Sequence, residues 1–73
     1  MSEADKFFEK INYIKIANGI NYIGYVSKDT PDFILFVLDK KMVCPHKHGT
    51  QYTGISMEEL KAIQMKCDEL GWI

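Results

Sequence analysis

Apolar residues recur at helical spacing near the start of the chain. They lie three or four residues apart, at Ala4, Phe7, Phe8, Ile11 and Ile14. This spacing places them on one face of an α-helix. Ser2 is a good N-cap, and Asn18-Gly19 can end the helix with a left-handed glycine. The pattern therefore predicts a helix over residues 2–17.

A β-hairpin is the alternative for the second half of this segment. Residues 11–14 (Ile-Asn-Tyr-Ile) recur as residues 20–23, and Asn-Gly at 18–19 is a strong signal for a two-residue hairpin turn. Such a turn would place Lys15 opposite Tyr22 and would mix polar and apolar residues on both faces. We therefore favour the helix and keep the hairpin as the competing interpretation.

Three strands are predicted in the middle of the chain. Residues 20–27 are rich in Ile, Tyr and Val, which favour strands. After a turn containing Pro31, residues 33–38 are apolar without interruption, so this strand should be central in its sheet. A third, short strand covers residues 42–44 and ends at Pro45.

The last predicted element is a helix with clear start and stop signals. Ser56 followed by Glu59 forms a capping box. Gly71 can end the helix as a left-handed residue, and Trp72 can pack back on the last turn. The expected buried stripe consists of Leu60, Ile63, Cys67 and Leu70.

The predicted fold class is α+β, with a helix, a three-stranded antiparallel meander and a helix (α-β-β-β-α) in one domain over residues 1–73. This order and length resemble the double-stranded-RNA-binding fold. That family binds phosphates through lysines at the start of its second helix, whereas residues 56–59 here are Ser-Met-Glu-Glu. We therefore assign no family and do not transfer that function.

Composition narrows the classes of function. The chain has 73 residues, 47% of them hydrophobic, and a net charge of −1; a disordered chain would be less apolar and more charged. All its basic residues are lysines, and without arginine sequence-specific DNA binding is not expected. The longest apolar run, Phe33 to Leu38, is too short to span a membrane. The acidic start does not look like a secretory signal, and two cysteines make no disulfide framework, so we expect a cytoplasmic protein.

One short segment carries residues that could bind a metal. Cys44, His46 and His48 would share a face if extended, and Cys67 could add a fourth ligand. The single-residue spacing is unlike that of zinc sites, and Cys67 lies on the apolar stripe of its helix. We therefore expect no metal and no cofactor. No acid that could orient a Cys–His pair is evident, so we also expect no enzymatic activity.

Two groups of residues could contact a macromolecular partner. Residues 39–48 are locally basic, and the aromatic residues are too many to fit in so small a core. The expected partner-binding residues are Tyr22, Tyr25, Lys40, Lys41, Lys47, Tyr52 and Trp72.

Both central predicted strands are apolar on both faces. If the two helices pack on one face of the sheet, the other face remains an interaction surface, which a homodimer would cover most simply. If the helices lie on opposite faces, no such surface exists.

We therefore predict a small stand-alone, non-enzymatic protein-binding module that acts stoichiometrically on a larger partner. An inhibitor or regulator of a host complex, encoded by a phage or mobile element, is one version. The alternatives are a nucleic-acid-associated accessory protein that uses residues 39–48 and a small zinc-binding protein.

Overall fold

The computed structural model describes residues 2–48 and 54–73, and these residues form two helices and four strands. In chain order the elements are α1 (Glu3–Lys10), β1 (Tyr13–Asn18), β2 (Tyr22–Ser27), β3 (Phe33–Val37), β4 (Met42–His46) and α2 (Met57–Glu69). The α+β class is confirmed, but the prediction of three strands is wrong by one. The additional strand also removes the match in element order to the double-stranded-RNA-binding fold.

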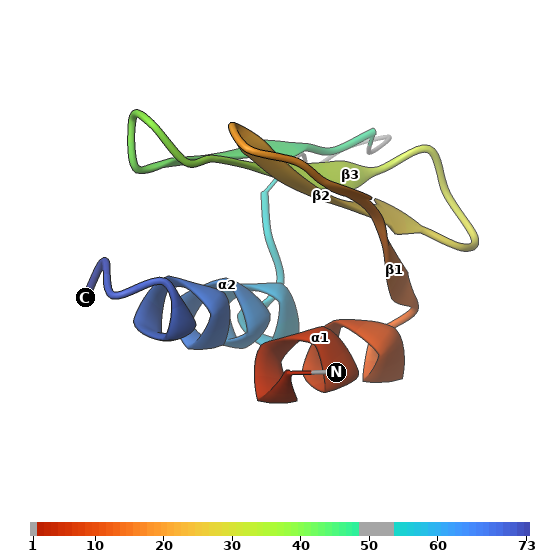
Figure 1. Cartoon of the computed structure of the whole chain (residues 1–73). Helices are drawn as coiled ribbons and strands as arrows, with labels where there is room; N and C mark the ends of the chain where they lie inside the picture. The colour runs from red at the N-terminus through yellow and green to blue at the C-terminus, as the bar shows by residue number, and fades with distance from the viewer. Residues whose placement is uncertain (1, 49–53) are drawn as a thin grey trace.

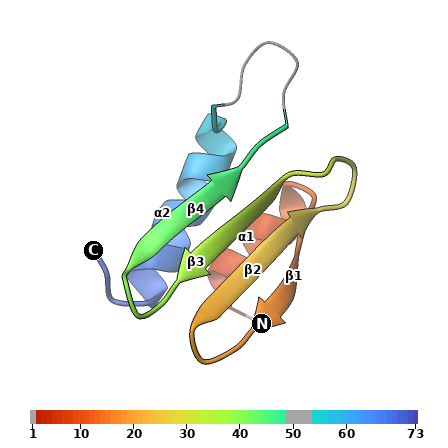
Figure 2. The same ribbon diagram turned by 90° about the horizontal axis from the view of Figure 1, so that it is seen from above.

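The strands form one antiparallel sheet in the order β1-β2-β3-β4, so β1 and β4 are its edges. Both helices lie under the same face of this sheet (Figure 1). Seen from above, the four strands lie in front of both helices, and no helix of the described chain covers this side (Figure 2). Neither helix in the described ranges is long and apolar enough to cross a membrane.

The first helix is much shorter than predicted, and the hairpin interpretation is the one found. The helix ends near Asn12, whose φ of 71° is left-handed; asparagine tolerates this conformation better than most residues. The hairpin register also differs from the two-residue turn, because Lys15 lies opposite Tyr25 rather than Tyr22. This register places Tyr13 and Tyr25 together on the helix side, where both are buried.

The core fills the layer between the sheet and the two helices. It consists of Phe8, Tyr13, Ile23, Tyr25, Ile34, Phe36, Ala62, Ile63 and Cys67. The ring of Phe8 stacks on Tyr25 with 3.9 Å between centroids, and Phe36 meets both rings edge-on. Aromatic packing thus joins α1 to the two central strands.

The second helix begins and ends as predicted. Ser56 and Glu59 form the capping box, and Gly71 has a φ of 76°. The Trp72 amide donates to the Cys67 carbonyl at 2.8 Å, which completes a Schellman motif. The buried stripe is only partly as expected: Ile63 and Cys67 are buried, Leu60 and Leu70 are half-buried, and Glu59 and Lys66 are buried instead.

Replacing Phe8 with alanine should remove most of the stability of the fold. Phe8 is fully buried, and a Phe→Ala cavity costs about 3–5 kcal/mol, against roughly 4–10 kcal/mol for a domain of this size. Urea denaturation measures the difference. Ile20→Ala is the control, because Ile20 is 93% exposed and should shift stability by less than about 0.5 kcal/mol. Equal midpoints for the two variants would contradict this packing.

Candidate functional site

A first polar cluster, here called the Asp5 cluster, joins both helices to strands β1 and β2. Its members are Asp5, Lys15, Tyr25, Lys66 and Glu69. Lys15 Nζ lies 2.7 Å from Asp5 Oδ2, and the Tyr25 hydroxyl donates to Asp5 Oδ1 at 2.5 Å. Lys66 Nζ lies 3.5 Å from Asp5 and 3.4 Å from Glu69. The Asp5 carboxylate therefore contacts residues of β1, β2 and α2.

Charge pairing sets the ionisation of this cluster. Burial raises the pKa of Asp5, but hydrogen bonds from Lys15 and Tyr25 and the charge of Lys66 outweigh it and lower the pKa to about 2. Burial and the bond to Asp5 raise the pKa of Tyr25. Asp5 is therefore ionised and Tyr25 neutral near pH 7, so the Tyr25 hydroxyl donates and the Asp5 carboxylate accepts.

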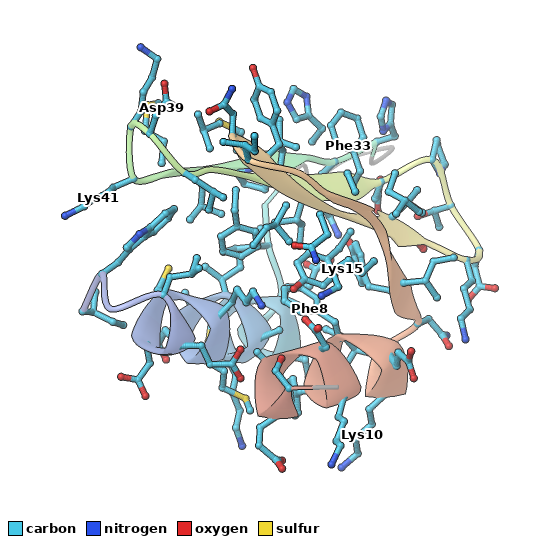
Figure 3. The ribbon with its side chains drawn as sticks, in the orientation of Figure 1. Phe8, Lys10, Lys15, Phe33, Asp39 and Lys41 are labelled. Atoms are coloured by element: carbon cyan, nitrogen blue, oxygen red, sulfur yellow. The ribbon has the colours of Figure 1, made fainter. Side chains whose placement is uncertain are left out.

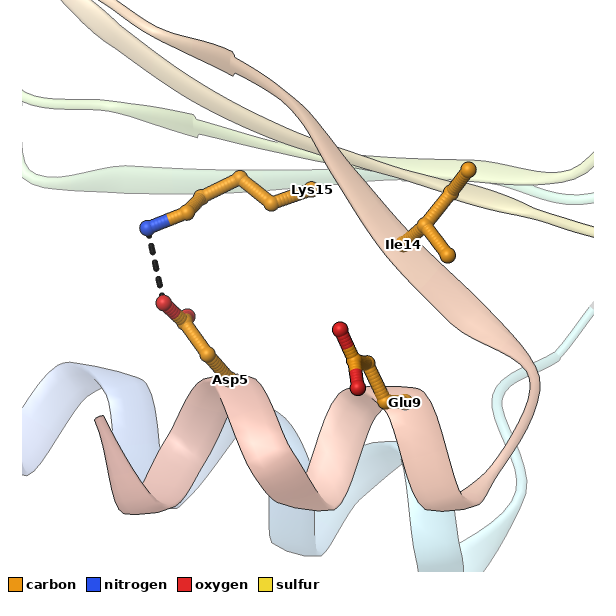
Figure 4. Close-up of a pocket in the computed structure, with 4 residues that line it drawn as sticks. All are labelled: Asp5, Glu9, Ile14 and Lys15. Atoms are coloured by element: carbon orange, nitrogen blue, oxygen red, sulfur yellow. Dashed lines mark ion pairs between the residues drawn. The ribbon is translucent and has the colours of Figure 1, made fainter. Parts of the chain in front are cut away.

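A cleft of about 350 Å³ opens beside this cluster, between α1 and β1. Asp5, Glu9, Ile14 and Lys15 line it, and the ion pair between Lys15 and Asp5 closes one side (Figure 4). Because Lys15 and Asp5 pair with each other, these two charged groups are already engaged within the fold. We therefore do not assign the cleft a ligand.

A second polar cluster, the Glu59 cluster, joins the first turn of α2 to the ends of three strands and contains Tyr13, Asp32, Lys47, His48 and Glu59. Lys47 Nζ is 3.2 Å from Asp32 and also pairs with Glu59. The Tyr13 hydroxyl donates to Glu59 at 2.6 Å, and the His48 amide donates to Asp32 at 2.6 Å. Glu59 thus caps α2 and at the same time binds the sheet.

This cluster removes Lys47 from the expected partner-binding set. Its side chain is only 17% exposed and is engaged by two carboxylates. Burial lowers the pKa of Lys47, but the bonds to Glu59 and Asp32 raise it overall. Burial raises the pKa of Glu59, but the bonds from Lys47 and Tyr13 lower it overall. The positive charge that the sequence suggested for a partner is used inside the fold.

The other expected partner-binding residues are scattered. Tyr22 is 49% exposed on the upper face of the sheet, whereas Tyr25 is 1% exposed and points into the core, where it is not accessible to a partner. Lys40 and Lys41 are exposed in the turn between β3 and β4. Trp72 is half-buried, 6.2 Å from the ring of Phe36. The prediction for Tyr52 lies outside the described residues.

The residues expected as weak metal ligands do not converge. Cys44 and His46 lie on the uncovered face of the sheet, where the His46 ring stacks on Phe33 at 4.3 Å. Cys67 is buried on the opposite side, in α2, and His48 turns its amide towards Asp32. Within residues 2–48 and 54–73, no three His, Cys, Asp or Glu residues are grouped so that they could hold a metal.

The uncovered face of the sheet, here called the open face, is almost entirely apolar. Side chains alternate along a strand, so the buried positions Ile23, Ile34 and Phe36 fix which residues point away from the helices. The open face consists of Ile14, Ile16, Ala17, Tyr22, Gly24, Val26, Phe33, Leu35, Val37, Met42, Cys44 and His46. None of these residues is Asp, Glu or Lys, although 26% of the chain is charged. Phe33 marks this face in Figure 3.

The middle of the open face is closely packed over a glycine. A Cβ atom added at Gly24 would lie 3.5 Å from both Ala17 Cβ and Leu35 Cδ1. The side chains of Ala17 and Leu35 therefore cover the backbone of Gly24, which has no side chain. Exposure increases towards the margins, where Ile16 is 63% and Met42 is 49% exposed.

The sequence pattern identified only part of this surface. The alternation of residues 33–38 correctly separates Phe33 and Leu35 from Ile34 and Phe36, as does the alternation around Tyr22 and Val26. Ile14 and Ile16 were missed because they were assigned to a helix. The signal that could have found them is the hairpin turn signal Asn-Gly at residues 18–19, because a hairpin there makes residues 13–18 a strand whose side chains alternate between the two faces.

Comparisons with protein-family models, curated proteins and solved structures give no match to this chain.

Changing Glu59 to glutamine should destabilise the fold near pH 7 and matter less in acid. The change keeps the volume and the capping position but leaves Lys47 without one carboxylate, at a cost of about 1–3 kcal/mol. The lowered pKa of Glu59 stabilises the fold above its ordinary value of 4.5, and this contribution is lost as the pH falls through the lowered pKa. Urea midpoints at pH 7 and pH 3 measure the effect. A difference of equal size at both pH values would contradict the ion pair.

We expect the purified protein to contain no stoichiometric zinc, because Cys44 and Cys67 lie on opposite sides of the sheet. Elemental analysis of protein prepared without a metal-affinity tag provides the test. One zinc ion per chain, absent from a Cys44→Ser variant, would show that the expectation is wrong.

Proposed function

We propose that this protein is a non-enzymatic protein-binding module that binds a larger partner stoichiometrically through the open face. The observation that carries the proposal is the placement of both helices on one side of a sheet whose other side is apolar (Figures 1 and 2). The open sides of antiparallel sheets are usually polar, because they face water. Covering an apolar face with another surface lowers the free energy, because apolar side chains are removed from water.

The size of the open face supports this function. With about 4.8 Å between strands and about 3.3 Å per residue, four strands of five or six residues make a face of roughly 19 by 18 Å, or about 340 Å². This is the range in which a contiguous apolar patch is often functional. Tyr22 and Phe33 add aromatic side chains, and tyrosine is enriched at binding hot spots.

The two polar clusters support a structural rather than a catalytic role for the ionisable residues. In the Asp5 cluster and the Glu59 cluster each carboxylate contacts a lysine of the same chain. Such groups hold the helices against the sheet. A cytoplasmic location is part of the proposal; it rests on Cys44 and Cys67 being free thiols.

A matched pair of methionine variants tests the proposal by affinity capture from the source cell. Met42→Glu places a charge on the open face, whereas Met57→Glu places one at the start of α2, and both positions are exposed (49% and 73%). We expect wild-type protein and Met57→Glu to retain one stoichiometric partner, and Met42→Glu to lose it while keeping the wild-type melting temperature.

Two outcomes would contradict the proposal. One is a stoichiometric protein partner that Met42→Glu and Tyr22→Glu both retain. The other is capture of nucleic acid that weakens steeply with salt and is lost when Lys40 and Lys41 are changed to glutamate. The second outcome would support the nucleic-acid alternative, since these lysines lie outside the open face.

A further inference from the structure

We infer that in the free protein a second copy of this chain occupies the open face, with the two sheets packed face to face in a reversible dimer. The inference rests on the proposed function, since it assigns the same surface. It states what covers the open face when the larger partner is not bound. The larger partner and the second copy then compete for the same surface.

The chemistry of the open face favours a second copy. The face carries no lysine, aspartate or glutamate side chain, and its one histidine, His46, stacks on Phe33 in the edge strand β4. Two copies can therefore meet there without repulsion between lysines or between carboxylates. A two-fold symmetric contact uses the same patch twice. The two patches in such a contact are both mainly aliphatic and aromatic, and they have the same area.

The edges of the sheet do not offer an equally good contact. Edge strands associate by extending the ladder of backbone hydrogen bonds. In β4, Pro45 has no amide hydrogen to donate, and in β1 a bulge between Lys15 and Ala17 interrupts the regular spacing. The two exposed edges are therefore both poor templates for another strand, and the face is the better surface.

The size of the open face predicts a weak dimer. Covering about 340 Å² of projected face in each copy removes roughly 700 to 1,000 Å² of accessible surface, below the roughly 1,200 Å² at which stable interfaces begin. Contacts of this size are typical of weak, transient association. Such a dimer is readily displaced by a partner that offers a larger surface.

Cys44 provides a probe inside the inferred interface. It lies opposite Leu35 on the open face and is partly exposed in the single chain. Cys67 is 8% exposed in the core, and burial raises its pKa, so it should react slowly and serve as an internal reference. Packed sheets are separated by about 10 Å of interdigitated side chains, which leaves no access to a thiol between them.

Two measurements on the full chain test the dimer. Sedimentation equilibrium from 1 μM to 1 mM should show a reversible change from one 8.4 kDa chain to two. Alkylation of Cys44 by iodoacetamide should slow by about fivefold once about four-fifths of the chains are dimeric. Met42→Glu should remain monomeric and react at one rate at all concentrations, while Met57→Glu should behave like wild type.

Each other outcome has a distinct meaning. A dimer in which Cys44 reacts at the same rate as in the monomer would use another surface and would overturn the inference. A monomer at every concentration would also overturn it. If that monomer still captures a stoichiometric partner that Met42→Glu loses, the proposed function stands and only the second copy is wrong; if it captures none, both fail.

Discussion

The Asp5 carboxylate is the contact on which the arrangement of layers depends. It accepts a hydrogen bond from Tyr25 and pairs with Lys15 and Lys66, so one side chain of α1 reaches two strands and the other helix. A buried carboxylate with these partners is costly to separate from them, because each would be left without its counter-charge. Both helices are therefore held to one side of the sheet, and the opposite side is left uncovered.

Local signals were sufficient for α2 and for the central strands. The capping box at Ser56 and the left-handed Gly71 depend only on neighbouring residues, and β3 is defined by an uninterrupted apolar run. Residues 11–18 depended on distant contacts. The helical spacing of Phe7, Ile11 and Ile14 predicts a continuous helix. In the structure Tyr13 lies in a strand and donates a hydrogen bond to Glu59, 46 residues away, and tertiary contacts of this kind override local preference.

The distribution of charge could not be predicted for a related reason. Lys47 lies between two histidines in a basic segment, and nothing near it in sequence indicates a carboxylate partner. Its partners are Asp32, in the turn before β3, and Glu59, in the first turn of α2. Pairing across the fold places the ionised groups under the sheet and leaves apolar side chains above it, the reverse of the distribution that a solvated antiparallel sheet usually shows.

Pro45 and the bulge in β1 also determine how far association can go. A sheet with an apolar face and two unprotected edges could add strands without limit, and chains joined in that way grow into filaments. In this sheet Pro45 and the bulge interrupt the ladder of backbone hydrogen bonds at both edge strands. Contact through the open face, in contrast, is complete once one other surface covers it. Association through the open face, as proposed above, would therefore end in a closed assembly of defined stoichiometry rather than in open-ended polymerisation.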